Sequence, residues 1–456
     1  MKKRIGIVGV ALALFLTMLA GCGGKSGNDA QPESSAAAQS DAEAKPEADK
    51  AENSGELVVI KYPTHQIGVN TAAPVIAQLV EEFNQTYQGK YEIQVEEIPG
   101  DANYVDKIKV LLGTDSLPPV VYTGGYNVLD LALAKDALVD LTEYVDADAD
   151  WKKLYTETSI TTNSRDGKIY ASSSEGSIVG YFYNKELFEK AGIAAPATTW
   201  EEFFAQCEQL KAAGITPLSM DTADSAWVTQ LWMGAMVATA NDAGYELMKQ
   251  MNPTDYNTPE MVQAVANVQK MLQEYTTPDA IGGKYEHAAN NFFSGNVAMI
   301  ANGPWMIGDF ADTTKAPEGF ADKVGVAVYP GGFVYDAPIQ GFMVTNQEDP
   351  KLVEASIEMV KFFTNEHAQQ LALETQGMVP ASPTVEITDA AKEKFPLLVE
   401  FLNIAEGATL RSDNMQATMY PNLLDIMSQQ LPLLAAGSLS PEDFCQILTE
   451  GAQKNQ

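Results

Sequence analysis

Residues 178–219 read IVGYFYNKELFEKAGIAAPATTWEEFFAQCEQLKAAGITPLS, and their pattern sets the architecture. The apolar runs at both ends are typical of buried strands. Between them, Thr199 and Glu202 have the spacing of a capping box, which begins a helix, and Gly214 is suited to end that helix. A strand, a helix and a second strand in this order predict an α/β unit.

The same alternation continues in both directions along the chain. Further strands are predicted at residues 57–60, 91–96, 120–122, 297–301, 324–329 and 341–345. Helices are predicted at residues 76–87, 103–112, 227–240, 259–274, 286–294, 350–364 and 414–434, and a last one begins at Ser440. We therefore expect α/β layers with largely parallel sheets, in a chain of 456 residues that can form two or three domains of roughly 150 residues.

The composition is strongly acidic. The chain has 29 basic and 61 acidic residues, a formal net charge of −32 and a pI near 4.3. This charge disfavours nucleic acid and anionic lipid surfaces as partners, because both are polyanions. We expect no nucleic-acid partner and no cofactor.

The first residues have the layout of a secretory signal peptide. A basic start, Lys2-Lys3-Arg4, precedes an apolar run from Ile5 to Ala20 that is short for a membrane span. The run ends in Leu19-Ala20-Gly21-Cys22, which resembles the lipobox of bacterial lipoproteins. We expect residues 1–21 to be a signal peptide and Cys22 to carry lipid, which anchors the protein on the extracytoplasmic face of the cell membrane.

Residues 22–55 are predicted to be a lipidated, flexible linker. They are rich in small and charged residues and lack aromatic side chains, so they cannot bury enough surface to offset the entropy of ordering. The linker has three lysines against seven acidic residues, and most of the negative charge therefore belongs to the body from Glu56 onward. Two further cysteines, Cys207 and Cys445, are expected to be buried free thiols.

Most signatures of catalysis are absent from the sequence. It contains no Gly-x-Ser-x-Gly elbow, no His-Glu-x-x-His, no Cys-x-x-Cys and no P-loop. The three histidines, His65, His287 and His367, are far apart and predict no metal site. The segment Asp146–Glu157 has acids at calcium-loop spacing, but Trp151 stands where that loop needs glycine, and we interpret the segment as an acidic turn.

Polar and aromatic residues gather where the predicted strands end. In α/β sheets, ligands bind beyond the carboxyl ends of the strands. Aromatic faces can pack against the C–H faces of a sugar ring, and carboxylates, amides and arginine can bond its hydroxyls. We therefore predict a site for a neutral polyol. The predicted ligand contacts are Tyr62, His65, Gln66, Gly124, Gly125, Tyr126, Glu175, Tyr181, Asp221, Trp227, Gly303, Trp305, Gly341 and Arg411.

Some of the aromatic residues are predicted to lie in the hydrophobic core and others at the ligand site. Trp200 and Trp232 lie within predicted helices and are expected in the core. Trp227 lies near a helix start, where core and site are equally supported, whereas Trp305 follows Gly-Pro on the first turn of a helix, which favours the site. Tyr181 shares a strand face with a second tyrosine, and one of the two is expected to be core.

Two motifs give this sequence a family resemblance. The first is Tyr183-Asn-Lys-Glu-Leu-Phe-Glu-Lys-Ala-Gly-Ile193 with Pro196, Thr199-Trp-Glu-Glu-Phe203 and Leu210-Lys-Ala-Ala-Gly-Ile-Thr-Pro217. The second is Phe292-Phe-Ser-Gly-Asn-Val-Ala-Met-Ile-Ala-Asn-Gly-Pro-Trp-Met306. Together they resemble the family 1 extracellular solute-binding proteins, which are the sugar-capturing lipoproteins of ABC importers and are related to maltose-binding protein. The resemblance covers residues 56–456.

The resemblance implies a periplasmic-binding-protein-like α/β fold, in which two lobes close about a hinge on a ligand in the cleft between them. Lobe 1 would comprise residues 56–180 and 330–385, and lobe 2 residues 181–329 and 386–456. The chain would cross between the lobes near residues 177–183, 328–338 and 380–388. The implied site includes the loop after the first strand, residues 124–126, Glu175 and Trp305.

The sequence departs from the family pattern at one of these loops. Gly124 and Gly125 stand where aromatic stacking residues are common in the family, and Pro119-Val120-Val121 replaces the usual Pro-Asp-Ile or Pro-Asp-Val. This departure argues against a large stacked malto-oligosaccharide. It leaves the particular sugar open.

The resemblance predicts a binding function. We expect a monomer that captures a mono- or oligosaccharide and delivers it to the membrane permease of an ABC importer, without catalysis. The acidic residues Glu175, Asp221 and Asp224 keep open a non-sugar solute such as a polyamine, a peptide or another cation. An extracellular carbohydrate-active enzyme is a less favoured alternative.

Overall fold

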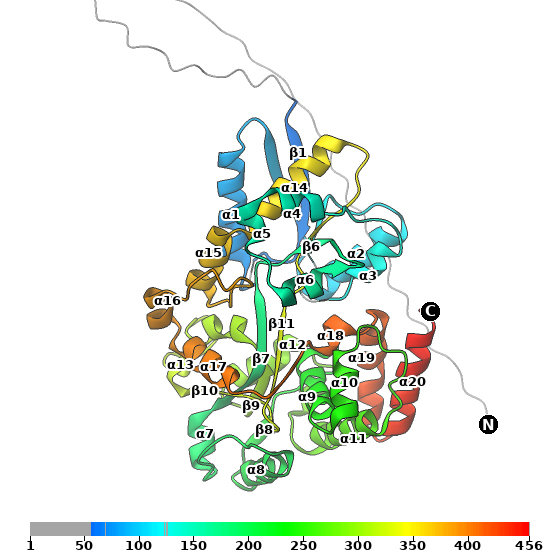
Figure 1. Ribbon diagram of the computed structural model, residues 1–456. Helices are drawn as coiled ribbons and strands as arrows, with labels where there is room; N and C mark the ends of the chain where they lie inside the picture. Colours follow the sequence, from blue (N-terminus) through cyan, green and yellow to red (C-terminus); the bar gives the residue numbers. More distant parts are fainter. Residues whose placement is uncertain (1–55, 69, 123, 125, 456) are drawn as a thin grey trace, which may run out of the picture. The chain divides into compact units, whose positions relative to one another are not determined.

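The computed structural model describes residues 56–68, 70–122, 124 and 126–455 (Figure 1). The predicted signal peptide and linker, residues 1–55 with Cys22, lie outside the described residues, and so does Gly125. The described residues from Glu56 onward form one compact unit, and the predicted alternation of strands and helices is present along it. The α/β class is therefore confirmed.

One group of strands comes mainly from the N-terminal part of the chain. Its members are β1 (Val58–Thr64), β2 (Tyr91–Glu97), β3 (Val120–Val121), β6 (Ala171–Ser172) and β12 (Phe342–Val344). β1 and β2 pair in parallel, whereas β12 is antiparallel to both β3 and β6. A hydrophobic cluster that includes the buried Ile60, Phe83, Val344 and Phe363 joins these strands to the helices around them.

A second sheet contains six further strands. They are β7 (Gly176–Asn184), β8 (Thr216–Leu218), β9 (Val297–Asn302), β10 (Val324–Ala327), β11 (Phe333–Pro338) and β13 (Leu410–Ser412). The order is β13-β11-β7-β9-β8, with β10 also on β7. β7 runs antiparallel to β9, β10 and β11, so the expectation of largely parallel sheets is wrong. An apolar run predicts that a strand is buried, but the direction of its neighbour is set by distant chain connections.

Three segments that are distant in sequence meet at the start of β7. Its first half pairs with β11, from Gly176 opposite Pro338 to Val179 opposite Tyr335, and its second half pairs with β9 and β10. The Gly176 N–H also donates to the carbonyl of Val379 at 2.8 Å. In Figure 1, β7 and β11 run side by side between the two groups of elements. The lobe boundaries predicted above, with these segments as the crossings, remain a proposal.

Helices surround both groups of strands. Those up to β7 are α1 (Ala73–Thr86), α2 (Asp101–Gly113), α3 (Leu129–Leu133), α4 (Thr142–Ala147), α5 (Ala149–Lys152) and α6 (Glu157–Asn163), followed by the hairpin β4 (Ser164–Arg165) and β5 (Lys168–Ile169). Between β7 and β11 lie α7 (Lys185–Lys190), α8 (Trp200–Ala212), α9 (Trp227–Ala238), α10 (Asp242–Lys249), α11 (Pro259–Glu274), η1 (Pro278–Ala280), α12 (Tyr285–Phe293), η2 (Pro304–Phe310) and α13 (Phe320–Lys323). The rest are α14 (Pro350–Thr364), α15 (Glu366–Gln376), α16 (Asp389–Lys394), α17 (Pro396–Glu406), α18 (Met415–Thr418), α19 (Asn422–Ala435) and α20 (Pro441–Gln453).

Local signals predicted helix ends well, with one exception. The capping box of α8 is present, because the Glu202 N–H donates to the Thr199 hydroxyl at 3.2 Å and the Glu202 side chain bonds back to the Thr199 N–H. The single helix predicted at residues 414–434 is wrong, since α18 ends at Thr418 and α19 begins at Asn422. Pro421 separates the two helices, and proline disfavours the helical conformation of the residue before it.

The centre of β7 is too crowded for a side chain at Gly180. A Cβ on Gly180 would lie 2.3 Å from the carbonyl oxygen of Ala327 and 3.1 Å from the ring of Phe401. We expect Gly180→Ala to lower the free energy of unfolding by about 1–3 kcal/mol through overpacking, as measured by urea denaturation. Gly113→Ala is the matched control, because a Cβ there meets nothing within 4 Å and alanine favours a helix. Equal stability of the two variants would contradict the crowding at β7.

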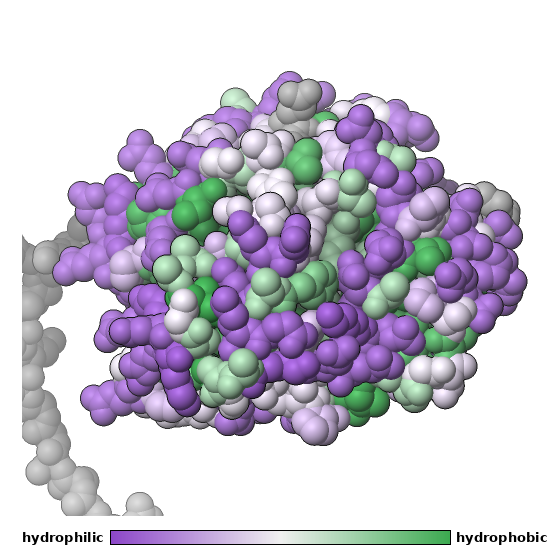
Figure 2. Space-filling model, turned by 90° about the horizontal axis from the view of Figure 1, so that it is seen from below, coloured by the Kyte–Doolittle hydropathy of each residue, from purple (hydrophilic) through white to green (hydrophobic). Residues whose placement is uncertain are grey.

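One face of the described body can be judged from its hydropathy. The face drawn in Figure 2 is mainly hydrophilic, with hydrophobic residues in small scattered groups. Within residues 56–455 as described, no helix is both long and apolar enough to cross a membrane. Cys207 and Cys445 are buried free thiols, as predicted.

Candidate functional site

The loop after β1 places a histidine among buried tyrosines. The His65 ring lies with its centre 5.0 Å from that of Tyr104, and it is nearly parallel to the ring of Tyr122 at 6.3 Å. Its Nε2 is 3.8 Å from Oδ1 of Asp101, at the start of α2. Burial lowers the pKa of His65, and the Asp101 carboxylate partly offsets this effect. The imidazole is therefore neutral at pH 7.

Several polar atoms beside this loop are buried without a partner. Among the described residues, Nδ1 of His65 and Oε1 of Gln66 have no hydrogen-bond partner, although both side chains are almost fully buried. Gly124 lies against the same ring, and a Cβ there would be 3.5 Å from Nε2 of His65. Buried polar atoms are normally hydrogen-bonded, so these atoms are suited to bind a polar ligand.

Glu175, just before β7, is a carboxyl group without a cation. Its Oε2 accepts a hydrogen bond from the Tyr122 hydroxyl at 3.4 Å, and the Tyr122 ring stacks on Phe342 at 4.4 Å. Burial raises the pKa of Glu175 to about 7, which the hydrogen bond from Tyr122 partly offsets. Tyr62 is fully buried in β1 beneath this group, with its ring edge-on to Phe363 at 6.0 Å. Among the described residues, no lysine or arginine pairs with Glu175.

Two tryptophans lie close together in α9 and η2, which follow strands β8 and β9 of the second sheet. The rings of Trp227, the first residue of α9, and Trp305 in η2 have their centres 6.0 Å apart. Nε1 of Trp227 donates to Oδ1 of Asn302 at 3.3 Å, and the Asn302 amide donates to the Tyr285 hydroxyl at 2.8 Å. A Cβ at Gly303 would lie 2.4 Å from the Trp305 ring, so glycine lets the indole lie against the backbone. Both indoles are half-buried.

Asp221 follows β8 and is 1 % exposed. Its Oδ1 accepts the Thr229 N–H at 3.2 Å, whereas Oδ2 has no hydrogen-bond partner among the described residues. Burial raises the pKa of Asp221 to about 7. Nearby Asp224 pairs with Lys284 at 3.2 Å, which leaves Asp221 as the carboxyl group of this loop without a cation.

Contacts between the two groups of elements bring these side chains near one another. Tyr126, after β3, is hydrogen-bonded to Ser225, which lies just before α9. The pKa of Tyr126 and that of Tyr285 are raised mainly by burial, and in both cases the carboxylate of Asp101 raises it further. Trp305, which follows β9 of the second sheet, packs against the hydrophobic cluster of the first group and against a larger cluster that contains residues of both groups.

The structure places three of the predicted contacts elsewhere. Tyr181 is fully buried, and its ring packs against Phe203, Trp232 and Tyr329, so it belongs to the core. The backbone of Gly341 packs so closely on β6 that a Cβ would lie 2.0 Å from the carbonyl oxygen of Ser172. We no longer propose these two residues as ligand contacts.

Arg411 is the third of these residues. Its guanidinium pairs with Asp336 on β11 and donates to the carbonyl of Ala405. It borders a separate pocket of about 360 Å³ whose walls include Ile178 and Leu402. Arg411 is therefore also removed from the proposed contacts.

Other residues at the site were missing from the prediction. They are Asp101, Tyr104, Tyr122, Tyr285 and Asn302. Tyr122 ends a predicted strand and Asn302 directly follows one, so their positions carried a signal. Tyr104 and Tyr285 lie on helices, where an aromatic residue on the apolar face is ordinarily core. Only the tertiary contacts distinguish them from core residues.

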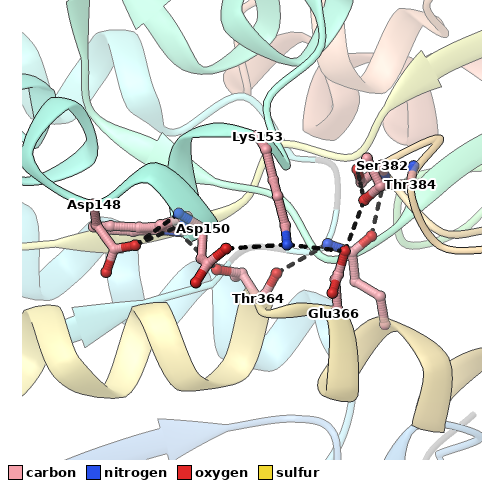
Figure 3. Close-up of polar contacts among 9 residues, drawn as sticks. Asp148, Asp150, Lys153, Thr364, Glu366, Ser382 and Thr384 are labelled. Carbon is pink, nitrogen blue, oxygen red and sulfur yellow. Dashed lines mark hydrogen bonds and ion pairs between the residues drawn. The ribbon is translucent and has the colours of Figure 1, made fainter.

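In the acidic segment at Asp146–Glu157, the carboxylates of Asp148 and Asp150 are bound by other groups of the protein. Asp148 caps α5 by accepting the backbone N–H groups of Asp150 and Trp151 at 3.0 Å each. Lys153 pairs with Asp150 at 3.1 Å and with Glu366 at 3.4 Å, and Figure 3 shows its ammonium between the two carboxylates. Across the described part of the chain, no group of three or more potential ligand residues is placed to hold a metal ion.

Comparison with known proteins identifies one matching family. The family described as bacterial extracellular solute-binding protein matches residues 78–396. A binding protein of Brucella abortus (strain 2308) is 27 % identical over 191 residues, which cover 40 % of this chain and 43 % of that protein. This chain thus aligns with less than half the length of the first curated relatives. A protein of Rhizobium meliloti (strain 1021) named as a sugar-binding periplasmic protein is 26 % identical over 294 residues, 64 % of this chain and 68 % of that one.

Solved structures share the fold at low sequence identity. A chitin oligosaccharide binding protein has a TM-score of 0.78 and 20 % identity, and the match covers 88 % of this chain and 99 % of that chain. A Streptococcus pneumoniae solute-binding protein in complex with the blood group A-trisaccharide has a TM-score of 0.74 and 19 % identity, over 88 % of this chain and all of the other. These likenesses confirm the periplasmic-binding-protein-like fold with two lobes.

Proposed function

Since this chain belongs to the family of bacterial extracellular solute-binding proteins, we propose that it captures a carbohydrate between its two lobes and delivers it to the permease of an ABC importer. The family consists of binding proteins that act outside the cytoplasm. Relatives named as sugar-binding periplasmic proteins support the choice of a sugar.

One observation carries this proposal. Trp227 and Trp305 lie 6.0 Å apart and half-buried, and Trp305, from lobe 2, also packs against a hydrophobic cluster made entirely of lobe-1 residues. An aromatic surface in this position can contact the apolar face of a sugar ring as the lobes close. Ligand that contacts both lobes favours the closed form over the open one.

The polar groups around the indoles suit hydroxyl recognition. Glu175 and Asp221 supply carboxylate acceptors, and Gln66 supplies an amide oxygen without a partner among the described residues. Sugar hydroxyls donate to such acceptors. His65 and Tyr126 complete the proposed set with Tyr62, Gly124, Gly125 and Gly303, of which Gly125 lies outside the described residues.

A second candidate ligand is a cationic solute such as a polyamine or a peptide. The observation in its favour is that Asp221 is buried and Glu175 half-buried, and neither has a lysine or arginine partner among the described residues. An ammonium group beside either carboxylate would stabilise its ionised form.

We further propose that lipid on Cys22 anchors the protein at the extracytoplasmic face of the cell membrane and that the protein acts as a monomer without catalysis. The lipobox-like sequence at residues 19–22 supports the anchor. The absence of catalytic motifs from the sequence supports a binding function.

A thermal-shift screen of the full chain tests the ligand class. Neutral mono- and oligosaccharides, polyamines and short peptides form its separate arms. We expect a sugar to raise the free energy of unfolding by about 2.7 kcal/mol at a concentration 100 times its dissociation constant. Stabilisation by a polyamine alone would favour the second candidate. Chromatography of the incubated oligosaccharides detects hydrolysis, and products would indicate an enzyme.

A further inference from the structure

Asn252 joins regions that we assign to different lobes, and it lies three residues after the end of α10. Its Oδ1 accepts a hydrogen bond from the Asn127 amide at 3.0 Å, and its own amide donates to Oδ2 of Asp130 at 3.0 Å. Asn127 is 2 % exposed and lies next to Tyr126, and Asp130 is in α3. The bridge therefore reaches from lobe 2 to the loop that carries Tyr126.

Each end of this bridge is held in place. Asp130 also accepts from Arg165, with Nε at 2.7 Å from Oδ1 and the second guanidinium nitrogen at 3.3 Å from Oδ2. On the other side, the Asn252 N–H donates to the carbonyl of Thr418 at 2.6 Å, and Asn252 has a φ of 51°. Asparagine is one of the few residues that adopt this left-handed conformation readily, so the residue type suits both the backbone and the bridge.

The segment that Asn252 holds is also fixed within its own lobe. The N–H groups of Val128 and Leu129 both donate to Oε1 of Gln340 at 3.3 Å. Gln340 thus holds the segment from one side and Asn252 from the other. Nearby, Lys109 on α2 pairs with Asp425 on α19 at 3.5 Å, which is a second polar contact between the two regions.

We propose that Asn252 is a positioning residue of the binding site, which holds the segment 126–130 of lobe 1 against lobe 2. Through this contact it keeps Tyr126 beside Ser225 and the two halves of the site together. The expected effect of Asn252 on ligand affinity rests on the proposed function. The contact itself is tested without ligand.

Hydrogen exchange of the full chain, followed by mass spectrometry, measures the contact directly. Asn252→Gly keeps the left-handed backbone and removes the bridging amide. We expect exchange in peptides covering residues 126–130 to rise at least about fivefold, because two hydrogen bonds are lost. Asp166→Gly in the β4–β5 turn is the matched control, since Asp166 also has a positive φ of 51° and lies on one lobe only. Unchanged exchange in Asn252→Gly would overturn the proposal.

Exchanging the carboxylate and the amide between positions 130 and 252 distinguishes loss of the bridge from a general loss of stability. Asn252→Asp places a second carboxylate opposite Asp130, and we expect faster exchange than in Asn252→Gly. The double variant Asn252→Asp with Asp130→Asn restores a carboxylate–amide pair with donor and acceptor exchanged, so exchange should return toward that of the parent. Because Asp130→Asn also weakens the ion pair with Arg165, Asp130→Asn alone is measured beside it, and a double variant that exchanges no more slowly than both single variants would count against the bridge.

The affinity arm uses the sugar that stabilises the parent most in the thermal-shift screen. We expect Asn252→Gly to speed its dissociation by at least about fivefold with a smaller change in the association rate, because closure loses a contact. An unchanged dissociation rate would overturn the role in binding. If no sugar binds, the proposed function fails, while the exchange experiment still decides whether Asn252 joins the lobes.

Discussion

Replacing Trp305 by alanine is expected to weaken binding of the sugar found in the screen by at least tenfold, about 1.4 kcal/mol. The indole lies against the Gly303 backbone and 6.0 Å from Trp227, and it packs on a hydrophobic cluster made of lobe-1 residues. Its loss removes the aromatic surface that we propose contacts the sugar ring. Isothermal titration calorimetry of parent and variant measures the change.

Two further variants make this test specific. Trp305→Phe retains an aromatic face, and we expect it to recover most of the affinity. Tyr144→Ala removes an exposed aromatic residue of α4, 47 % exposed, and should leave the affinity unchanged. A folded Trp305→Ala variant with the calorimetric affinity of the parent would refute the assignment of Trp305 to the site.

Replacing Glu175 by glutamine is expected to stabilise the free protein at pH 8 while it weakens ligand binding. Glu175 is half-buried, and its partner in the described structure is the Tyr122 hydroxyl at 3.4 Å. The neutral amide avoids the cost of a buried carboxylate, so we expect a gain of about 1–3 kcal/mol in the free energy of unfolding at pH 8. The same change removes an ionised acceptor, and affinity should fall by roughly tenfold to a hundredfold.

The pH dependence of stability has a definite sign. Burial raises the pKa of Glu175 from 4.5 to about 7, so between these values the native state holds a proton that the unfolded state has lost. Stability therefore falls as the pH rises from about 4.5 to 7, and it stays at the lower level above pH 7. Asp221 and Asp413, whose pKa burial also raises to about 7, contribute in the same direction. Glu175→Gln should make the fall smaller without removing it.

Urea denaturation between pH 4.5 and 8 measures this dependence. Glu348→Gln, at an exposed position, is the matched control and should follow the parent. If Glu175→Gln is no more stable than the parent at pH 8, Glu175 is not a buried, uncompensated carboxylate. Unchanged ligand affinity in the same variant would separately remove Glu175 from the site.

Much of the local structure was predictable from short stretches of the chain. The capping box at Thr199 and Glu202 specified the start of α8, because its partners are three residues apart. The alternation of strands and helices predicted the α/β class, and the motifs at residues 183–217 and 292–306 predicted the family. Trp305, after Gly-Pro at the end of a strand, was the clearest local signal of a site residue.

Contacts between residues that are distant in sequence could not be predicted from these short stretches. The burial of Tyr181 against Trp232, the pairing of Arg411 with Asp336 and the antiparallel neighbours of β7 all join residues 51 or more positions apart. The bridge from Asn252 to Asp130 spans 122 positions. Local patterns predict helices and strands because their hydrogen bonds and apolar spacing involve nearby residues. Which polar side chains are removed from water, as Asp221 is fully and Glu175 in part, depends on how the whole chain packs, and that packing makes the candidate site.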